Sequence, residues 1–257
     1  MNSLRIFIGV DVRHILQYTV LHTSIMARTG SPIAITPLLD YQLPVKRRGL
    51  TSFTWTRFLV PWLCDYKGWA VFMDSDMMAL ADIQKLFDLR DESKAVMVCQ
   101  NRLKFEWGSM MLFNCGHPDN KVLTPEYIET AEGLHGCQWT DNVGSLPLEW
   151  NHLVGYDEPQ DAKLVHFTQG VPCYPETKES EYSAEWNAEA KAAMTAVSWQ
   201  EIMGQSVHAK PVYERLSGGP VECPSCKEPL EKIEHFDGGR KAHYQCGHVA
   251  VNGEMAA

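Results

Sequence analysis

The sequence of 257 residues contains no apolar run that approaches the about 18 residues needed for a membrane-spanning helix. Its first ten residues, Met1-Asn-Ser-Leu-Arg-Ile-Phe-Ile-Gly-Val10, have the pattern of a β-strand and lack the cleavage pattern of a signal peptide. Internal repeats and low-complexity tracts are absent as well. These absences exclude a membrane-embedded or fibrous protein and predict a cytoplasmic location.

Basic residues are also scarce. The chain has 23 Lys and Arg against 32 Asp and Glu, which gives a formal net charge of −9. Such a field repels polyanions and argues against nucleic acid as a partner. Any nucleotide or phosphate ligand therefore has to be held locally, by a bound cation or a helix N-terminus. With 45% hydrophobic and 21% charged residues, the composition excludes a disordered chain.

The eight cysteines do not form the framework of a disulfide-stabilised protein. Five are scattered among apolar or aromatic neighbours, where free cysteine behaves as a small hydrophobe, and the other three lie between residues 223 and 246. At roughly 150 residues per domain, the length favours one large domain with a small appendage. Because Ser217-Gly-Gly-Pro220 is a flexible break, we expect domains at residues 1–216 and 217–257.

Strand-like and helix-like runs alternate through the first half of the chain. Strands are expected at residues 5–10, 33–39, 69–73, 95–99 and 109–113, and helical segments at 14–27, 54–62 and 81–89. This alternation predicts an α/β protein with an open sheet, which binds ligands beyond the carboxyl ends of its strands. Residues 133–158 show no clear period and are expected to be irregular, whereas 181–203 predict a helix.

The strand at 69–73 runs into Asp74-Ser-Asp76. Because side chains of an extended segment alternate between its faces, the two carboxylates are expected on the same side. Two hard oxygen donors at this spacing can hold one divalent cation, which can bridge to a diphosphate. The alternative is a pair of solvated turn aspartates that cap the helix near Ala81.

Several segments, in order along residues 4–185, resemble the glycosyltransferases of family 8 and their relatives. The resemblance rests on Thr54-Trp-Thr-Arg-Phe-Leu-Val-Pro-Trp-Leu63, Trp69-Ala-Val-Phe-Met-Asp-Ser-Asp-Met77, Asp82-Ile-Gln-Lys-Leu-Phe87, Ile8-Gly-Val-Asp11, Ser109-Met-Met-Leu-Phe-Asn114, Leu146-Pro-Leu-Glu-Trp-Asn151 and Val165-His-Phe-Thr-Gln-Gly170. It implies a GT-A fold, which is Rossmann-like, and a retaining, metal-dependent transfer of a sugar from a nucleotide diphosphate. A UDP-sugar is the expected donor, and the acceptor is a glycan, a protein or a small molecule.

The resemblance also implies roles for single residues. It places Asp74, Asp76 and His166 around Mn²⁺ or Mg²⁺, and it places Asp11, Arg57, Ser75 and Asp141 at the donor. Asp11 would contact the base or ribose, Arg57 the sugar nucleotide and Asp141 the transferred sugar, with Arg57 and Asp141 as the expected catalytic residues. The structural alternatives are a helix N-cap for Asp11, a surface salt bridge for Arg57 and a satisfied core position for His166.

Two departures from the family pattern affect the donor site. The Asp-Gln-Asp pattern around Asp141 is not intact, and no lysine follows in Gly170-Val-Pro-Cys-Tyr174, where the family has one that reaches the diphosphate. Gln169 or the backbone N–H of Gly170 is the expected substitute. Trp139, Trp150 and Tyr174 could stack on sugar faces, but such aromatic residues are more often part of a core.

The C-terminal segment contains Cys223-Pro-Ser-Cys226 and, twenty residues later, His243-Tyr-Gln-Cys246-Gly247-His248. This spacing predicts a structural zinc site, and the segment resembles a zinc ribbon. The expected ligands are Cys223, Cys226, His243 and Cys246, with His248 as an alternative for the fourth position. Because the segment is too short to fold on an apolar core, zinc would supply its stability. The alternatives are a disordered tail with incidental cysteines and a Cys-x-x-Cys redox pair, which lacks the helix that usually follows it. A ribbon could dock a protein partner, order the end of the chain or contact nucleic acid.

Two alternatives to a transferase remain. A strand that ends in Asp-x-Asp also begins phosphatases of the haloacid dehalogenase type, but these have Thr or Val at the position of Met78 and a late acidic pair, which is not evident here. The other alternative is a catalytically silent sugar-nucleotide-binding or adaptor protein, which the missing lysine supports.

Overall fold

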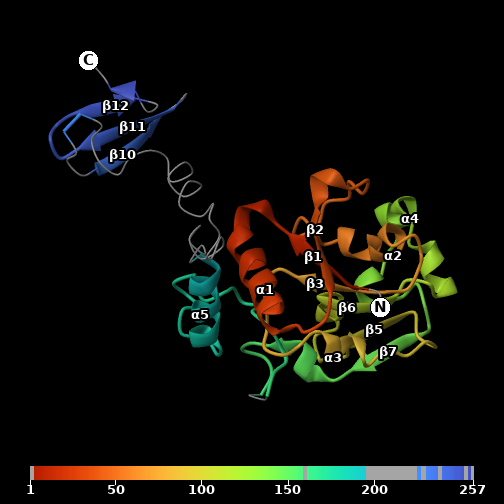
Figure 1. The fold of residues 1–257 in the computed structure, drawn as a ribbon. Helices are drawn as coiled ribbons and strands as arrows, with labels where there is room; N and C mark the ends of the chain where they lie inside the picture. Colours follow the sequence, from red (N-terminus) through yellow and green to blue (C-terminus); the bar gives the residue numbers. More distant parts are fainter. Residues whose placement is uncertain are drawn as a thin grey trace. The chain divides into compact units, whose positions relative to one another are not determined.

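The computed structural model describes residues 3–158, 161–194, 225–226, 230–236, 239–251 and 254–255. The chain divides into two compact units, residues 1–195 and 196–257 (Figure 1). The domain boundary expected between residues 216 and 217 lies outside the described residues.

The larger unit is built on a mixed six-stranded sheet of order β2-β1-β3-β6-β5-β7. Its strands are β1 (Leu4–Val10), β2 (Ile33–Leu39), β3 (Trp69–Asp74), β5 (Val96–Cys99), β6 (Met110–Asn114) and β7 (Val143–Leu146). β1 is parallel to both β2 and β3, whereas β6 is antiparallel to β3 and β5. The carboxyl ends of β1, β2 and β3 therefore meet at one edge of the sheet.

The two faces of this sheet bury separate apolar clusters, because alternate side chains of each strand point to opposite faces. Ile6 and Ile8 of β1 join the cluster that includes residues of α1 (Ile15–Arg28) and α3 (Gln84–Phe87), whereas Phe7 joins the opposite cluster with Phe58. Each fully buried side chain of this size contributes about 1.5–3 kcal/mol to folding. The strands consequently read as continuous apolar runs, which made them predictable.

A second, three-stranded sheet positions the histidine expected at the site. It has the order β4-β9-β8, with strands β4 (Met77–Ala79), β8 (His152–Leu153) and β9 (Leu164–His166). Met77 pairs with His166, which brings the end of β9 beside the turn that follows β3. α5 (Ser183–Met194) contributes Trp186 to the cluster around Phe167. The end of β9 is thereby anchored by packing on its neighbours.

Two expectations about secondary structure were wrong in detail. The helix expected at 54–62 is a 3₁₀ turn, Thr56–Leu59, followed by the single turn α2 (Val60–Leu63), where Pro61 lacks the N–H that a continuous α-helix needs. The region 133–158, expected to be irregular, contains β7 and β8. β7 carries Gly144 and Ser145, so its sequence lacks the apolar alternation of a strand.

The remaining elements are short and connect the strands. They are the 3₁₀ turns η1 (Val12–His14), η2 (Asp40–Gln42), η4 (Lys104–Gly108), η5 (Pro118–Val122), η6 (Leu134–Gly136) and η7 (Leu148–Trp150), and the helix α4 (Pro125–Thr130). The helix expected at 181–203 is described as far as Met194. Among the described residues, no helix combines the length and apolar character needed to cross a membrane.

The smaller unit contains a four-stranded antiparallel sheet of order β10-β11-β12-β13. Its strands are β10 (Leu230–Phe236), β11 (Gly239–Tyr244), β12 (Val249–Val251) and β13 (Glu254–Met255). The Tyr244 N–H donates to the His248 carbonyl over 3.0 Å and closes the turn between β11 and β12, in which Gly247 has a φ of 83°. This turn carries Cys246 and His248.

Candidate active site

Asp74 is the last residue of β3, at the edge where the parallel strands end. It pairs with Gly9 of β1, and its backbone N–H donates to the Ser109 carbonyl over 2.9 Å. The chain turns directly after it, so Asp76 lies in the turn before β4 and not in a continuous extended segment as expected. The two carboxylates nevertheless converge, because the turn brings Asp76 back toward the sheet edge.

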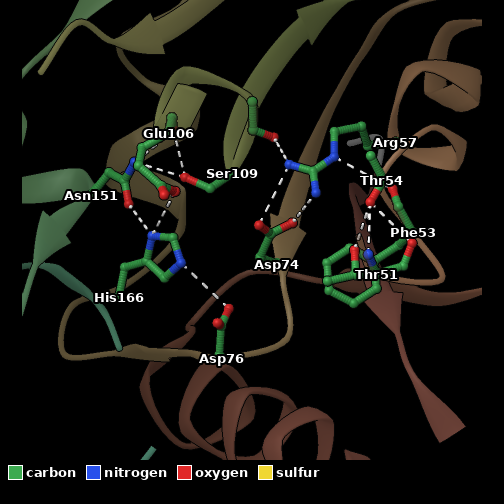
Figure 2. Close-up of polar contacts among 11 residues, drawn as sticks. Thr51, Phe53, Thr54, Arg57, Asp74, Asp76, Glu106, Ser109, Asn151 and His166 are labelled. Carbon is green, nitrogen blue, oxygen red and sulfur yellow. Dashed lines mark hydrogen bonds and ion pairs between the residues drawn. The ribbon is translucent and has the colours of Figure 1, made fainter. Parts of the chain in front are cut away.

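The convergence includes a third residue. Ligand atoms of Asp74, Asp76 and His166 all lie within 4.8 Å of one another (Figure 2). Asp74 Oδ1 and Asp76 Oδ1 are buried and accept no hydrogen bond of ordinary geometry. Two carboxylates with an imidazole form a suitable donor set for Mn²⁺. The residues present therefore fit a divalent cation.

Arg57 is the cation that faces Asp74 from the opposite side. Its Nη2 lies 3.1 Å from Asp74 Oδ1, and its Nη1 donates to the Gly108 carbonyl over 2.6 Å. Both side chains are buried, so the alternative of a surface salt bridge does not describe Arg57. Burial raises the pKa of Asp74 to about 7, against the lowering effect of Arg57 and with a further rise from Asp76. A second positive charge would favour the ionised carboxylate.

The orientation of His166 is set by Asn151. The Asn151 amide donates through Nδ2 to Ser109 Oγ over 3.0 Å and to the Glu106 carbonyl over 3.2 Å, so its Oδ1 faces His166. His166 Nδ1 lies 3.1 Å from that oxygen and is therefore the nitrogen that carries the proton. His166 Nε2 faces Asp76, whose Oδ1 is 3.4 Å away, so Nε2 is the ring nitrogen that a bound cation would meet.

The carboxylates around the His166 ring and the burial of the ring have opposite effects on its pKa. Desolvation lowers the pKa of His166, but Asp76, Asp74 and Glu106 together raise it above its ordinary value. Glu106 is the third carboxylate here, with its Oε2 3.9 Å from His166 Nδ1. The site is therefore strongly anionic, and a bound cation would relieve the repulsion among its carboxylates.

Sequence reasoning assigned no role to Glu106, Ser109 or Asn151. Asn151 ends one of the segments that carry the family resemblance and Ser109 begins another, so these segments contained a signal for both. Glu106 lies in η4, outside the matched segments, and its sequence neighbourhood gives no comparable signal.

The other donor-site candidates are more dispersed. Asp11 caps η1 by accepting from the Arg13 N–H and pairs with the Arg13 guanidinium, which lowers the pKa of Asp11. The N-cap alternative is thus observed. Ser75 is buried beside the two aspartates, and its hydroxyl has no hydrogen-bond partner. Asp141 is exposed and does not belong to the group of possible metal ligands.

The expected substitutes for the missing lysine differ in availability. The Gly170 N–H donates to the Phe167 carbonyl over 2.8 Å, so it is already engaged, whereas the Gln169 side chain is exposed.

Two of the aromatic residues considered for sugar stacking belong to the packed interior. Trp150 is buried in the core, and the Trp139 indole donates to Asn120 Oδ1 over 3.0 Å. The core interpretation therefore holds for both tryptophans.

In the smaller unit, ligand atoms of Cys226, Cys246 and His248 lie within 4.8 Å of one another. His248, the expected alternative, is part of this group, whereas His243 on β11 is not, within the described residues. Cys223 lies outside the described residues. The three grouped side chains are suitable zinc ligands.

Comparisons with solved structures show the class of fold. The bifunctional glycosyltransferase WbbM has a TM-score of 0.58 at 13% identity, over 83% of this chain and 51% of that chain, so the present chain spans about half of WbbM. Galactosyltransferase LgtC has a TM-score of 0.53 at 11% identity, over 75% and 97%. GlyE of Streptococcus pneumoniae TIGR4 has a TM-score of 0.55 at 15% identity, over 76% and 63%. The chain has the α/β fold of GT-A glycosyltransferases, as predicted.

A curated relative shows the family. Protein CDI of Arabidopsis thaliana is 38% identical over 222 residues, which covers 72% of this chain and 85% of that protein. The chain belongs to the family of Protein CDI. No protein-family model matches it.

Proposed function

We propose that the protein is a metal-dependent glycosyltransferase that transfers a sugar from a nucleotide diphosphate, with a UDP-sugar as donor and a glycan, protein or small molecule as acceptor. The observation that carries this proposal is the convergence of Asp74, Asp76 and His166 at the edge of a GT-A sheet. These residues would hold Mn²⁺ or Mg²⁺, which neutralises the charge that develops on a diphosphate leaving group.

The proposed reaction forms one bond and breaks another. The acceptor hydroxyl oxygen bonds to the anomeric carbon and loses its proton, while the bond from that carbon to the diphosphate oxygen breaks and leaves its electron pair on the diphosphate. The family resemblance suggests retention of configuration. Arg57 holds Asp74 in place over 3.1 Å, and Asn151 holds the His166 ring.

Further contacts to the donor are proposed for the other donor-site candidates. Asp11 would contact the base or ribose, and Ser75 and Gln169 the diphosphate end, with Gly170 at the turn that positions Gln169. Asp141 is proposed to lie near the transferred sugar once a donor is bound. The absence of a lysine after Gly170 favours one competing proposal, a sugar-nucleotide-binding protein without transferase activity.

A donor screen tests the proposal. We expect Mn²⁺ with one of the UDP-, GDP- or ADP-sugars to raise the melting temperature, and the same mixture to show donor turnover. Asp76→Asn and His166→Gln should abolish both Mn²⁺-dependent effects while the fold persists, and the exposed Asp88→Asn should retain them. Binding without turnover for every donor would favour the silent protein, and phosphate release from simple phosphomonoesters would favour the phosphatase.

We also propose that the smaller unit binds one structural Zn²⁺ through Cys226, Cys246 and His248, with Cys223 or His243 as the fourth ligand, and that it docks a protein partner. The grouping of the three side chains supports the zinc site, and the docking of a partner rests on the resemblance to a zinc ribbon. Metal analysis of the purified chain should find about one zinc per chain, and Cys246→Ala should remove it. A zinc content that this substitution leaves unchanged would contradict the assignment.

A further inference from the structure

Two surface segments of the larger unit share an unusual composition. Residues 46–50 read Lys-Arg-Arg-Gly-Leu and residues 102–105 read Arg-Leu-Lys-Phe, so each places cations beside apolar side chains. Leu50 is 85% exposed, Phe105 56% and Leu103 38%. Neither segment contains an acidic residue, although the chain has 32 of them. Both segments therefore present positive charge and apolar area to solvent.

Aromatic rings join the two segments, which lie far apart in the sequence. The Trp55 indole donates to the Arg48 carbonyl over 3.0 Å, and the Arg47 guanidinium covers the Trp55 ring at 3.6 Å. On the other side, the His135 ring lies 5.2 Å from Trp55 and stacks on Phe105 at 4.8 Å. Together they form one basic–apolar surface, which consists of residues 46–50 and 102–105 with the rings of Trp55 and His135.

Positive charge prevails on the basic–apolar surface. It carries five cations, none of which forms an ion pair with a carboxylate in the part of the chain that the structure describes: Lys46, Arg47, Arg48, Arg102 and Lys104. The Lys46 ammonium donates to the Leu43 carbonyl over 2.8 Å, and the Lys104 ammonium lies 5.1 Å from the centre of the Trp107 ring. The nearby Glu129 carboxylate accepts from the Lys46 backbone N–H. In a chain with a net charge of −9, such a group of cations indicates an anionic partner.

The exposed apolar side chains distinguish among anionic partners. A nucleic acid would use the cations and could stack a base on Phe105, but Leu50 and Leu103 have no ring for stacking. A membrane with anionic lipids uses all of these groups, because cations bind at the headgroups while leucine and aromatic side chains enter the boundary with the acyl chains. A tryptophan such as Trp55, with an apolar body and a polar N–H, also suits this boundary.

We propose that the basic–apolar surface docks the larger unit on a lipid bilayer that contains anionic phospholipids. The cations lie at the level of the headgroups, and Leu50 and Phe105 enter the region below them. The surface borders the candidate active site, since Phe105 directly precedes Glu106, whose Oε2 is 3.9 Å from His166 Nδ1. This inference goes beyond the proposed function and does not depend on sugar transfer.

Vesicle binding by the full chain tests the role of the cations. The chain should sediment with vesicles of phosphatidylcholine and phosphatidylserine in equal parts, and it should stay in solution with phosphatidylcholine alone. Lys46→Gln combined with Arg48→Gln should weaken binding more than tenfold, because each cation near an anionic surface contributes about a factor of five.

The matched control removes the same two charges elsewhere. Lys85 lies in α3 and Arg90 follows it, and α3 packs on the face of the sheet opposite to the cluster that includes Trp55. Lys85→Gln combined with Arg90→Gln should therefore bind the mixed vesicles like the wild type.

Substitutions of the apolar side chains test insertion into the bilayer. Leu50→Ser and Phe105→Ser should each weaken binding to the mixed vesicles about fivefold at unchanged charge, because less apolar area leaves water. Both side chains are exposed, so the fold should persist, which circular dichroism and thermal unfolding check. Leu89→Ser, at a residue 37% exposed after α3, should leave binding unchanged.

Three results would overturn the proposal. The first is no binding of the wild type to the mixed vesicles, and the second is an equal loss in the surface variants and the α3 controls. The third is vesicle binding that Leu50→Ser and Phe105→Ser leave unchanged, because charge alone would then hold the chain. A short single-stranded RNA is the remaining probe. Binding to it that the cation variant loses, without vesicle binding, would assign the surface to nucleic acid instead.

Discussion

Asn151 is the residue on which the geometry of the candidate site depends most directly, although it does not belong to the group of possible metal ligands. Its amide is fixed by Ser109 and the Glu106 backbone, and it in turn fixes the proton on His166 Nδ1. Residues that orient a metal-binding histidine in this way commonly affect metal affinity about 10–100-fold.

Replacing Asn151 should therefore weaken metal binding without removing a ligand. We expect Asn151→Leu to lower Mn²⁺ affinity by about 10–100-fold, because His166 Nδ1 loses its acceptor. Asn151→Asp, which still offers an oxygen to Nδ1, should recover much of the affinity. Calorimetric titration of Mn²⁺ measures both, and equal losses in the two variants would show that the amide has another role.

His135 is a residue with a pH-dependent contribution to stability. Its ring stacks on Phe105 at 4.8 Å and meets Phe58 edge-on at 5.3 Å, and burial, with Arg57 and Arg47, lowers the pKa of His135 to about 4. The unfolded chain binds this proton near pH 6.5, whereas the folded chain does not. Stability from the neutral ring is thus complete above pH 6.5 and is lost as the pH falls toward 4.

His135→Phe should remove this pH dependence. The loss in the wild type is at most about 3 kcal/mol, from 1.36 kcal/mol per pKa unit, and it is smaller because the ring is partly exposed. We expect the free energy of unfolding to fall less between pH 7 and pH 4.5 in His135→Phe than in the wild type. His22→Gln serves as the control, and parallel pH profiles for the wild type and His135→Phe would contradict the assignment.

At the scale of elements, the sequence predicted the strands that are continuous apolar runs. β1, β3, β5 and β6 begin or end within a residue or two of their expected positions, because buried central strands are apolar at nearly every residue. β2 also matches its expected range, although it is a partly exposed edge strand. β7 was missed because Gly144 and Ser145 interrupt its pattern, and its pairing with β5 defines it.

The candidate site was predictable to a more limited extent. The Asp74 and Asp76 pair follows from spacing in the sequence, and His166 came only from the family resemblance. Asn151 contacts Ser109 across 42 residues and His166 across 15, so its role depends on how β6, η7 and β9 pack together. Contacts of this kind are set by the tertiary fold, which local sequence patterns do not specify.

The register of β1 against its neighbours depends on close packing at Gly9. A Cβ at this position would lie 2.4 Å from Phe53 Cγ, and Gly9 pairs with Asp74. We expect Gly9→Ala to lower the free energy of unfolding by about 1–3 kcal/mol, because the Phe53 ring has to move. It should also weaken Mn²⁺ binding.

Gly30→Ala is the matched control, since the nearest atom to its Cβ would be Asp82 Oδ2 at 3.9 Å. Chemical denaturation of the two variants compares them directly. Equal stability of Gly9→Ala and Gly30→Ala would mean that the Phe53 contact does not constrain β1.

At the scale of the whole molecule, the two groups of possible metal ligands lie in different compact units. Every residue of the candidate active site lies within residues 3–194, and the possible zinc ligands Cys226, Cys246 and His248 lie in the smaller unit. The larger unit contains the apolar clusters on both faces of its own sheet.

A chain that ends at residue 195 should therefore fold and bind Mn²⁺ with an affinity within about twofold of the full chain, because nothing in its site is removed. Thermal unfolding and Mn²⁺ titration of the shortened chain measure this. Loss of binding by more than tenfold, with the fold intact, would show that the smaller unit contributes to the site.

The pairing of Asp11 with Arg13 has a consequence for the proposed contact between Asp11 and the ribose of a donor. Since the carboxylate is already neutralised by an exposed guanidinium, a sugar hydroxyl that reaches it exchanges one partner for another. The net gain from that exchange is small. A ligand benefits most when the same molecule also receives the displaced arginine, which favours compounds that carry a hydroxyl and an acidic group a short distance apart.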